Sequence, residues 1–150
     1  MLPQLPQLTE LDLSDNRLTD VALTPLCKVA VRMPGLTSLD LSRNDMDEAA
    51  AVLRVYLAAP ACAMAKLVLS AADIDDWECA ALMAAVEKNR SLTHLDLSHN
   101  LIGAAEQLNA VHPDLVTGGE AIAEMLQMNK TLKLLDVSWN TIRKEVCNGM

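Results

Sequence analysis

The segment LTHLDLSHNLI, residues 92–102, contains the pattern that decides the fold of this chain. Its leucines at positions 95 and 97 alternate with polar residues, the period of two expected of a β-strand with one buried face. Related segments begin at residues 8, 36, 64 and 132. The first four copies start 28 residues apart and the last starts 40 after the fourth, which is 28 plus an insertion of 12. Five copies in register predict a repeat architecture.

Apolar residues spaced four apart predict one helix between each pair of strand segments. Their expected buried faces are formed by Ala22, Leu26 and Ala30, by Leu53 and Leu57, by Leu82 and Val86, and by Ile122 and Leu126. Asp20, Glu48 and Asp76 lie near the predicted helix starts, where negative charge is favourable. A strand and a helix cannot bury their apolar faces alone, so neighbouring repeats must stack around a common core.

The shared pattern LxxLxLxxNxL resembles the leucine-rich repeat, and the 28-residue period is similar to that of its ribonuclease-inhibitor-like subclass. The resemblance covers residues 8–142 and implies an α/β fold. The implied fold is a right-handed solenoid, a horseshoe segment with parallel strands on the concave face and helices on the convex face. We therefore predict one domain over residues 1–150, with about five repeats and an insertion within 103–117. The resemblance implies a structural role for the asparagine at the ninth position, which is replaced by Ala72 in the third copy.

The charge of the chain limits its partners. It has 150 residues, 12 basic against 20 acidic, and a net charge of −8. This argues against nucleic acid and anionic membranes as partners and favours a protein with a basic patch. The longest uncharged apolar run, residues 55–65, is shorter than the roughly 20 residues that a spanning helix needs. No basic segment precedes an apolar one at the N-terminus, so we expect a cytoplasmic protein.

The exposed strand positions form the predicted binding face. The motif position between the two strand leucines is usually aspartate. These aspartates either support solubility and local structure or bind basic side chains of a partner. The third and eighth motif positions vary between repeats, and variation of this kind suits partner recognition. The predicted protein-binding residues are Glu10, Asp12, Asp15, Asp40, Arg43, Lys66, His94, Asp96, His99, Asp136 and Trp139. The alternative is a solvated face that binds nothing.

The two tryptophans and the insertion have alternative interpretations. Trp139 is either a binding anchor or an end-cap over the last strand, whereas Trp77 is expected to pack on the convex side. The insertion is either part of a binding surface or a tolerated loop. Neither end of the chain resembles a cap, which favours a slice of a longer protein or association through the solenoid ends.

No catalytic or cofactor motif is recognised. His94, Asp96 and Ser98 lie along one strand about 7 Å apart, too far for a nucleophile and its base. The cysteines have no zinc-ligand spacing and are expected to be reduced thiols, mostly buried, rather than a disulfide framework; they are Cys27, Cys62, Cys79 and Cys147. We predict a non-enzymatic interaction scaffold without metal or cofactor. The alternatives are a GTPase regulator like the Ran-activating proteins and a structural segment of a cytoskeletal, ciliary or NOD-like-receptor-type protein.

Overall fold

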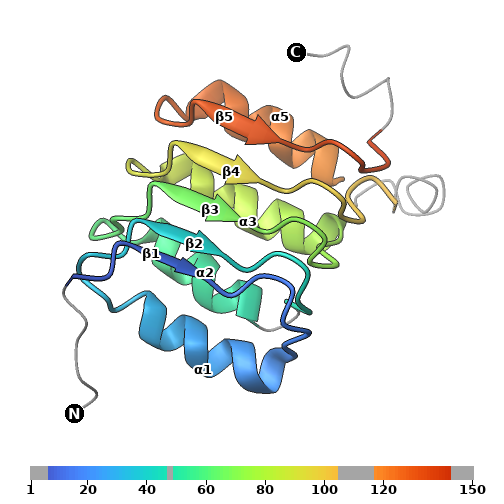
Figure 1. Ribbon diagram of the computed structural model, residues 1–150. Helices are drawn as coiled ribbons and strands as arrows, with labels where there is room; N and C mark the ends of the chain where they lie inside the picture. The colour runs from blue at the N-terminus through green and yellow to red at the C-terminus, as the bar shows by residue number, and fades with distance from the viewer. Residues whose placement is uncertain (1–6, 47–48, 105–116, 143–150) are drawn as a thin grey trace.

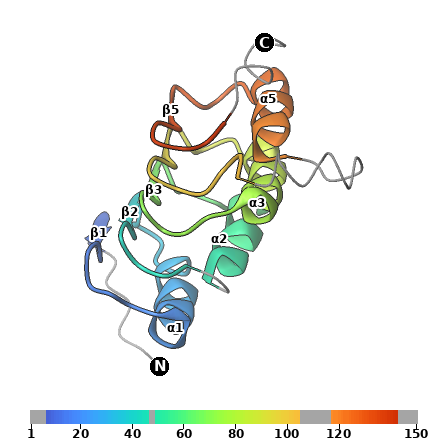
Figure 2. The same ribbon diagram turned by 90° about the vertical axis from the view of Figure 1, so that its right-hand side faces the viewer.

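The computed structural model describes residues 7–46, 49–104 and 117–142 (Figure 1). Five short strands form one parallel sheet in chain order: β1 Glu10–Asp12, β2 Ser38–Asp40, β3 Lys66–Val68, β4 His94–Asp96 and β5 Leu134–Asp136. The described helices are α1 Asp20–Ala30, α2 Ala49–Ala58, α3 Asp76–Lys88 and α5 Gly118–Met128. Strands and helices form two separate layers, with the helices covering one side of the sheet (Figure 2). The predicted α/β solenoid is therefore confirmed.

The strand register shows how the insertion is accommodated. Paired positions are 28 residues apart from β1 to β4, as in the pair Glu10 and Ser38. From β4 to β5 they are 40 apart, since His94 pairs with Leu134. The 12 extra residues thus lengthen the connection between β4 and β5 without changing the strand register. Residues 105–116, together with Glu48 and Cys147, lie outside the described residues.

The core lies between the two layers. Leucines at the fourth and sixth motif positions of the three middle strands are fully buried: Leu39, Leu41, Leu67, Leu69, Leu95 and Leu97. Their counterparts in the end repeats, Leu11 and Leu135, are half-buried because each end strand has a neighbour on one side. The period of two therefore located the inward side chains of the sheet correctly.

The helix faces were predicted less well. Leu53, Leu57, Leu82 and Val86 are buried as expected. In α1, however, the buried stripe contains Leu23, Cys27 and Ala30, and Leu26 is exposed. In α5, Met125 is buried next to Ile122, and Leu126 is exposed. Adjacent apolar residues on a helix differ by about 100° in direction, and a spacing of four cannot tell which of the two faces the sheet.

Asparagines at the ninth motif position, of which Asn44 and Asn100 are buried and Asn140 half-buried, connect the turns that follow the strands. The Nδ2 group of Asn44 donates to the carbonyl of Leu13 in the preceding repeat, and its Oδ1 accepts from the N–H of Leu18. Asn100 and Asn140 repeat both contacts with the equivalent backbone groups. The predicted structural role of the ninth position is confirmed for these three residues.

A second row of asparagines connects the ends of the helices, and the sequence analysis did not anticipate it. Asn89, which follows α3, donates to the carbonyl of Leu57 at the end of α2. Asn129, which follows α5, donates to the carbonyl of Val86 in α3. The two asparagines occupy equivalent places in NRSL and NKTL, so an internal comparison of helix ends would have found them.

The buried carboxylate of Asp76 joins the two ends of the insertion. Its Oδ1 accepts hydrogen bonds from the N–H groups of Gly103 and Gly118, at 2.9 and 2.6 Å. A Cβ atom at position 118 would lie 2.5 Å from the side chain of Ile102. This close approach explains why glycine begins α5. Asp20 and Asp76 each begin a helix, as predicted.

Candidate protein-binding face

The outward side chains of the strands form one surface with those of the turns after them. We call this surface the strand face. The register places the third-position residues in one row, from β1 to β5: Glu10, Ser38, Lys66, His94 and Leu134. Of these, Ser38 is half-buried and the other four are exposed. The row changes from charged side chains at β1 to an exposed leucine at β5.

The aspartate column has a structural role in every repeat that contains it. Oδ1 of Asp12, Asp40, Asp96 and Asp136 accepts a hydrogen bond from the N–H of the serine two residues later, at 2.8–2.9 Å. Hydrogen bonds from the Ser14 side chain and N–H lower the pKa of Asp12, and Lys66 adds to this effect. Bonds from the N–H and side chain of Ser138 lower the pKa of Asp136, aided by nearby His99. The lowered pKa values keep Asp12 and Asp136 negatively charged at neutral pH, and all four aspartates hold the backbone where a strand ends.

The eighth motif position is held in the left-handed backbone region in all five repeats. Asp15, Arg43, Ala71, His99 and Trp139 have φ between 50° and 58°. Each of the first four donates its backbone N–H to the carbonyl of the serine in the next repeat, for example from His99 to Ser138 at 2.9 Å. The backbone is thereby fixed by neighbouring turns, and the side chains are left to vary.

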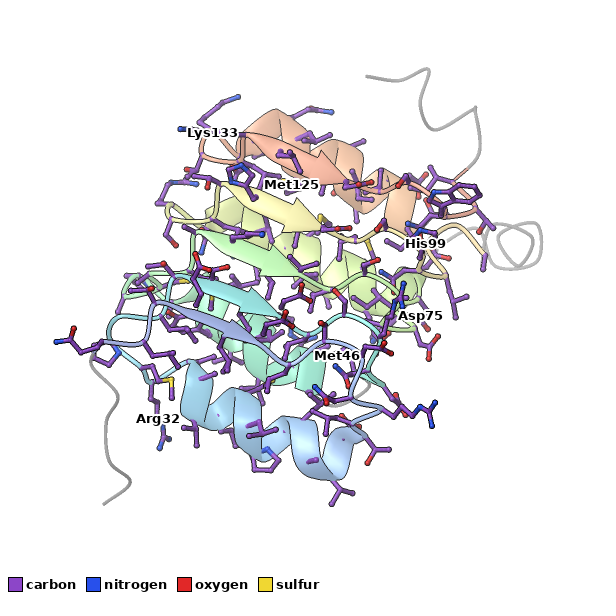
Figure 3. All side chains as sticks on the ribbon, viewed as in Figure 1. Arg32, Met46, Asp75, His99, Met125 and Lys133 are labelled. Atoms are coloured by element: carbon purple, nitrogen blue, oxygen red, sulfur yellow. The ribbon has the colours of Figure 1, made fainter. Side chains whose placement is uncertain are left out.

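Side chains at the eighth motif position contact one another in the first two and in the last two repeats. Arg43 and Asp15 form an exposed ion pair, with 3.9 Å between Nη1 and Oδ2. Figure 3 labels His99 at the turn after β4. Its ring stacks on that of Trp139, with ring centroids 5.4 Å apart and an angle of 8° between the planes. Trp139 is nevertheless 77% exposed, and Leu134 is 49% exposed. The strand face therefore has a charged end and an aromatic, apolar end.

Trp139 lies exposed on the outer surface and stacks on His99 of the preceding repeat, an arrangement that suits a binding anchor better than an end-cap. The expectation for Trp77 was wrong. This residue belongs to the first turn of α3 and is 75% exposed, because it lies on the side of the helix opposite the buried Val86.

The polar residues of β4 do not form a catalytic arrangement. Asp96 bonds to the backbone of Ser98, whose hydroxyl lies 2.9 Å from that of Ser70. The Nδ1 atom of His94 contacts the hydroxyl of Thr93 at 2.8 Å. Within residues 7–46, 49–104 and 117–142, no group of three or more His, Cys, Asp or Glu side chains could hold a metal ion.

The described cysteines are free thiols, with Cys27 and Cys79 buried and Cys62 half-buried. Burial raises the pKa of Cys27 to about 11 and that of Cys79 to about 12, with smaller contributions from nearby carboxylates. These two side chains pack as small apolar residues in the core. None of the described helices is long and apolar enough to cross a membrane.

Comparisons with known proteins agree with this geometry. Residues 6–50 match the family model for leucine-rich repeats in two copies. Residues 88–105 and 129–145 match a second leucine-rich-repeat model. The chain folds as a leucine-rich-repeat solenoid. Such repeats are in general non-enzymatic modules for protein interaction.

A solved structure of the leiomodin-1 actin-binding site 2 is similar to this solenoid. The two share 20% sequence identity with a TM-score of 0.70, and the match covers 89% of this chain and 72% of the other. At this identity the likeness concerns the fold. No curated protein matches the chain.

Proposed function

We propose that this leucine-rich-repeat protein binds a protein partner on its strand face, centred on the stacked pair His99 and Trp139, with the exposed Leu134 at the start of β5 as a second apolar contact. The exposed, stacked indole is the observation that carries the proposal. Tryptophan is enriched among the residues that dominate binding energy at interfaces. Stacking orders the ring before binding, so less side-chain entropy is lost when a partner covers it.

The partner's contact surface is proposed to be basic. Asp96 and Asp136 are paired neighbours in the sheet, and each uses Oδ1 for the strand-ending hydrogen bond. Asp96 and Asp136 end their strands three residues before His99 and Trp139, so their charges lie at the same end of the strands as the aromatic pair. An arginine of the partner fits this combination, because its planar cation stacks on indole and pairs with carboxylates.

The experiment is quantitative capture from a cell lysate with three baits. These are the wild-type chain, Trp139→Ala and the matched control Trp77→Ala, which removes an equally exposed indole from the helical side. A partner on the strand face is expected to fall at least tenfold with Trp139→Ala and less than twofold with the control. Equal retention by all three baits, or equal loss with both variants, would contradict the proposal. Circular dichroism checks that both variants fold.

A second pair of baits separates charge from the aromatic contact. Arg43→Glu with Lys66→Glu reverses two exposed cations of the strand face, and Arg54→Glu with Lys88→Glu reverses two on the helical side. A basic partner should bind the first variant more strongly and should be unaffected by the second. Weaker binding of the first variant would exclude a basic contact surface.

A cytoskeletal partner is the second candidate. The similar structure carries an actin-binding name, so filamentous actin is the first purified protein to test, by co-sedimentation. Regulation of a small GTPase remains a hypothesis and is tested by measuring the hydrolysis rate with and without the chain. Cytoplasmic localisation and membership of the ribonuclease-inhibitor-like subclass are further proposals, the latter supported by the 28-residue register.

A further inference from the structure

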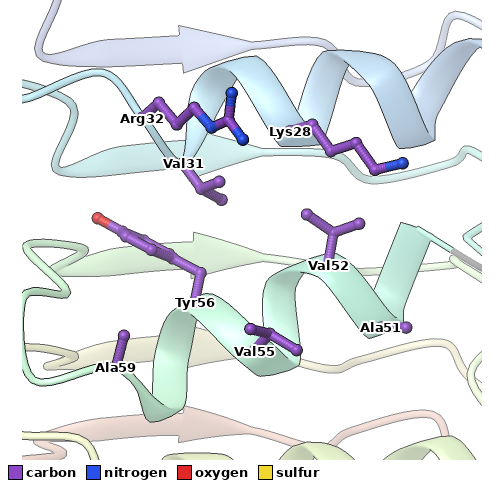
Figure 4. A pocket seen from close by; sticks show the side chains of 8 residues that line it. All are labelled: Lys28, Val31, Arg32, Ala51, Val52, Val55, Tyr56 and Ala59. Atoms are coloured by element: carbon purple, nitrogen blue, oxygen red, sulfur yellow. The ribbon is translucent and has the colours of Figure 1, made fainter.

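A groove of about 490 Å³ lies between α1 and α2 on the helical face, the side opposite the strand face (Figure 4). Its apolar lining consists of Val31, Ala51, Val52, Val55, Tyr56 and Ala59. Val55 is 70% exposed, an unusual degree for an aliphatic side chain beside other apolar residues. The small side chains of Ala51 and Ala59 leave the space that deepens the groove.

One wall of the groove is fixed by a hydrogen bond. Tyr56 projects from α2 toward α1, and its hydroxyl oxygen accepts from the N–H of Ala63 at 3.1 Å. Because both the helix and the loop after it hold this ring, the wall exists before any ligand arrives. A preformed surface loses less conformational entropy on binding.

The other wall carries positive charge. Lys28 in the last turn of α1 and Arg32, two residues after its end, are exposed, lie four positions apart and both line the groove. None of the described residues that line the groove is a carboxylate. The salt bridge found among the described residues joins Arg43 and Asp15. Neither Lys28 nor Arg32 therefore has a carboxylate as a salt-bridge partner among them. In a chain with 20 acidic and 12 basic residues, this places two cations beside an apolar floor.

Further repeats at either end of the solenoid would not fill this groove. It lies between two consecutive helices of the same chain, whereas an added repeat stacks on an outer side of the array. The groove is therefore a property of the α1–α2 pair itself.

We propose that this groove binds an acidic amphipathic segment of a partner protein. An aliphatic side chain of the segment lies against Val52 and Val55, and two carboxylates spaced four residues apart face Lys28 and Arg32. A helix presents groups with this spacing on one side, and helix binding in an apolar groove is a recurrent mode of recognition. The site is independent of the strand face, so one chain can hold two partners at once.

The test is selection from a phage-displayed library of random 16-residue peptides. The immobilised wild-type chain is compared with Lys28→Glu/Arg32→Glu and with Val55→Asp, whose changes are at exposed positions. Arg54→Glu/Lys88→Glu is the matched control, because it reverses two cations of the helical side that do not line the groove. The dissociation constants of selected peptides are then measured by fluorescence anisotropy at low and high salt.

We expect selected peptides to combine aliphatic residues with Asp or Glu four apart. Their affinity should fall at least tenfold with Lys28→Glu/Arg32→Glu and with Val55→Asp, and less than twofold with the control. Failure to select any peptide, selection without acidic residues, or equal binding to all variants would overturn the proposal. A dimer of the wild-type chain that dissociates in Lys28→Glu/Arg32→Glu would also overturn it, because a second copy would then be the occupant.

Discussion

Replacement of Asn100 by alanine tests how strongly the stacked turns hold one another. The buried Oδ1 of Asn100 accepts hydrogen bonds from the N–H groups of Ala72 and Ile74, at 3.0 and 3.1 Å. Its Nδ2 donates to the carbonyl of Leu69 in the preceding repeat at 2.8 Å, and to two carbonyls of its own turn. Asn100→Ala removes these bonds and leaves two buried N–H groups without this acceptor.

A buried donor left without a partner costs about 1–3 kcal/mol. With two such donors, we expect Asn100→Ala to lower the free energy of unfolding by about 3 kcal/mol. The measurement is urea unfolding followed by far-ultraviolet circular dichroism, which reports on the helices. Asn16→Ala is the matched control, because Asn16 is exposed and bonds to the carbonyls of Leu13 and Ser14 in its own turn. We expect the control to lose less than about 0.5 kcal/mol.

The two asparagines are expected to differ because Asn100 connects two repeats and Asn16 bonds within its own turn. A loss of less than about 1 kcal/mol in Asn100→Ala, or equal losses in both variants, would refute this expectation. Either result would mean that the leucine packing of the repeats, and not the asparagine contacts, supplies nearly all of the cohesion between turns.

Further predictions concern the same framework. Ala72→Asn adds the missing ninth-position amide and is expected to raise the free energy of unfolding by about 1 kcal/mol, measured by the same urea titration. Gly118→Ala places a Cβ atom 2.5 Å from the side chain of Ile102 and should lower the free energy of unfolding by more than about 1 kcal/mol. An unchanged urea midpoint would show that α5 can shift to make room for the added atom. The raised pKa values of Cys27 and Cys79, about 11 and about 12, keep both thiols protonated at pH 8. Mass spectrometry should therefore find alkylation by iodoacetamide less than about one hundredth as fast as in the unfolded chain.

Much of the candidate site could be predicted from the repeat alone. Because equivalent residues of stacked repeats meet in the sheet, the motif spacing was enough to place His94 beside Leu134 across an insertion. The interpretation of Trp77 failed because the helical period was not applied to it: nine residues separate it from the buried Val86, which puts it about 180° around the helix, on the exposed side. The α1–α2 groove could not be predicted, since it depends on how far apart two helices pack and on which small residues face each other there.

The sequence by itself determined the repeat, the strand positions and the inward leucines, because these follow from a local alternation of two and from its recurrence. The tertiary structure alone decided the stacking of His99 on Trp139, the helix-end contacts of Asn89 and Asn129, and the bonds from Gly103 and Gly118 to Asp76. These contacts join groups that are 27 to 43 residues apart, and they exist only where stacking brings neighbouring turns to hydrogen-bonding or van der Waals distance. The spacing of residues within one repeat does not determine the distance between neighbouring turns. The surfaces proposed to bind partners therefore form only when the repeats stack.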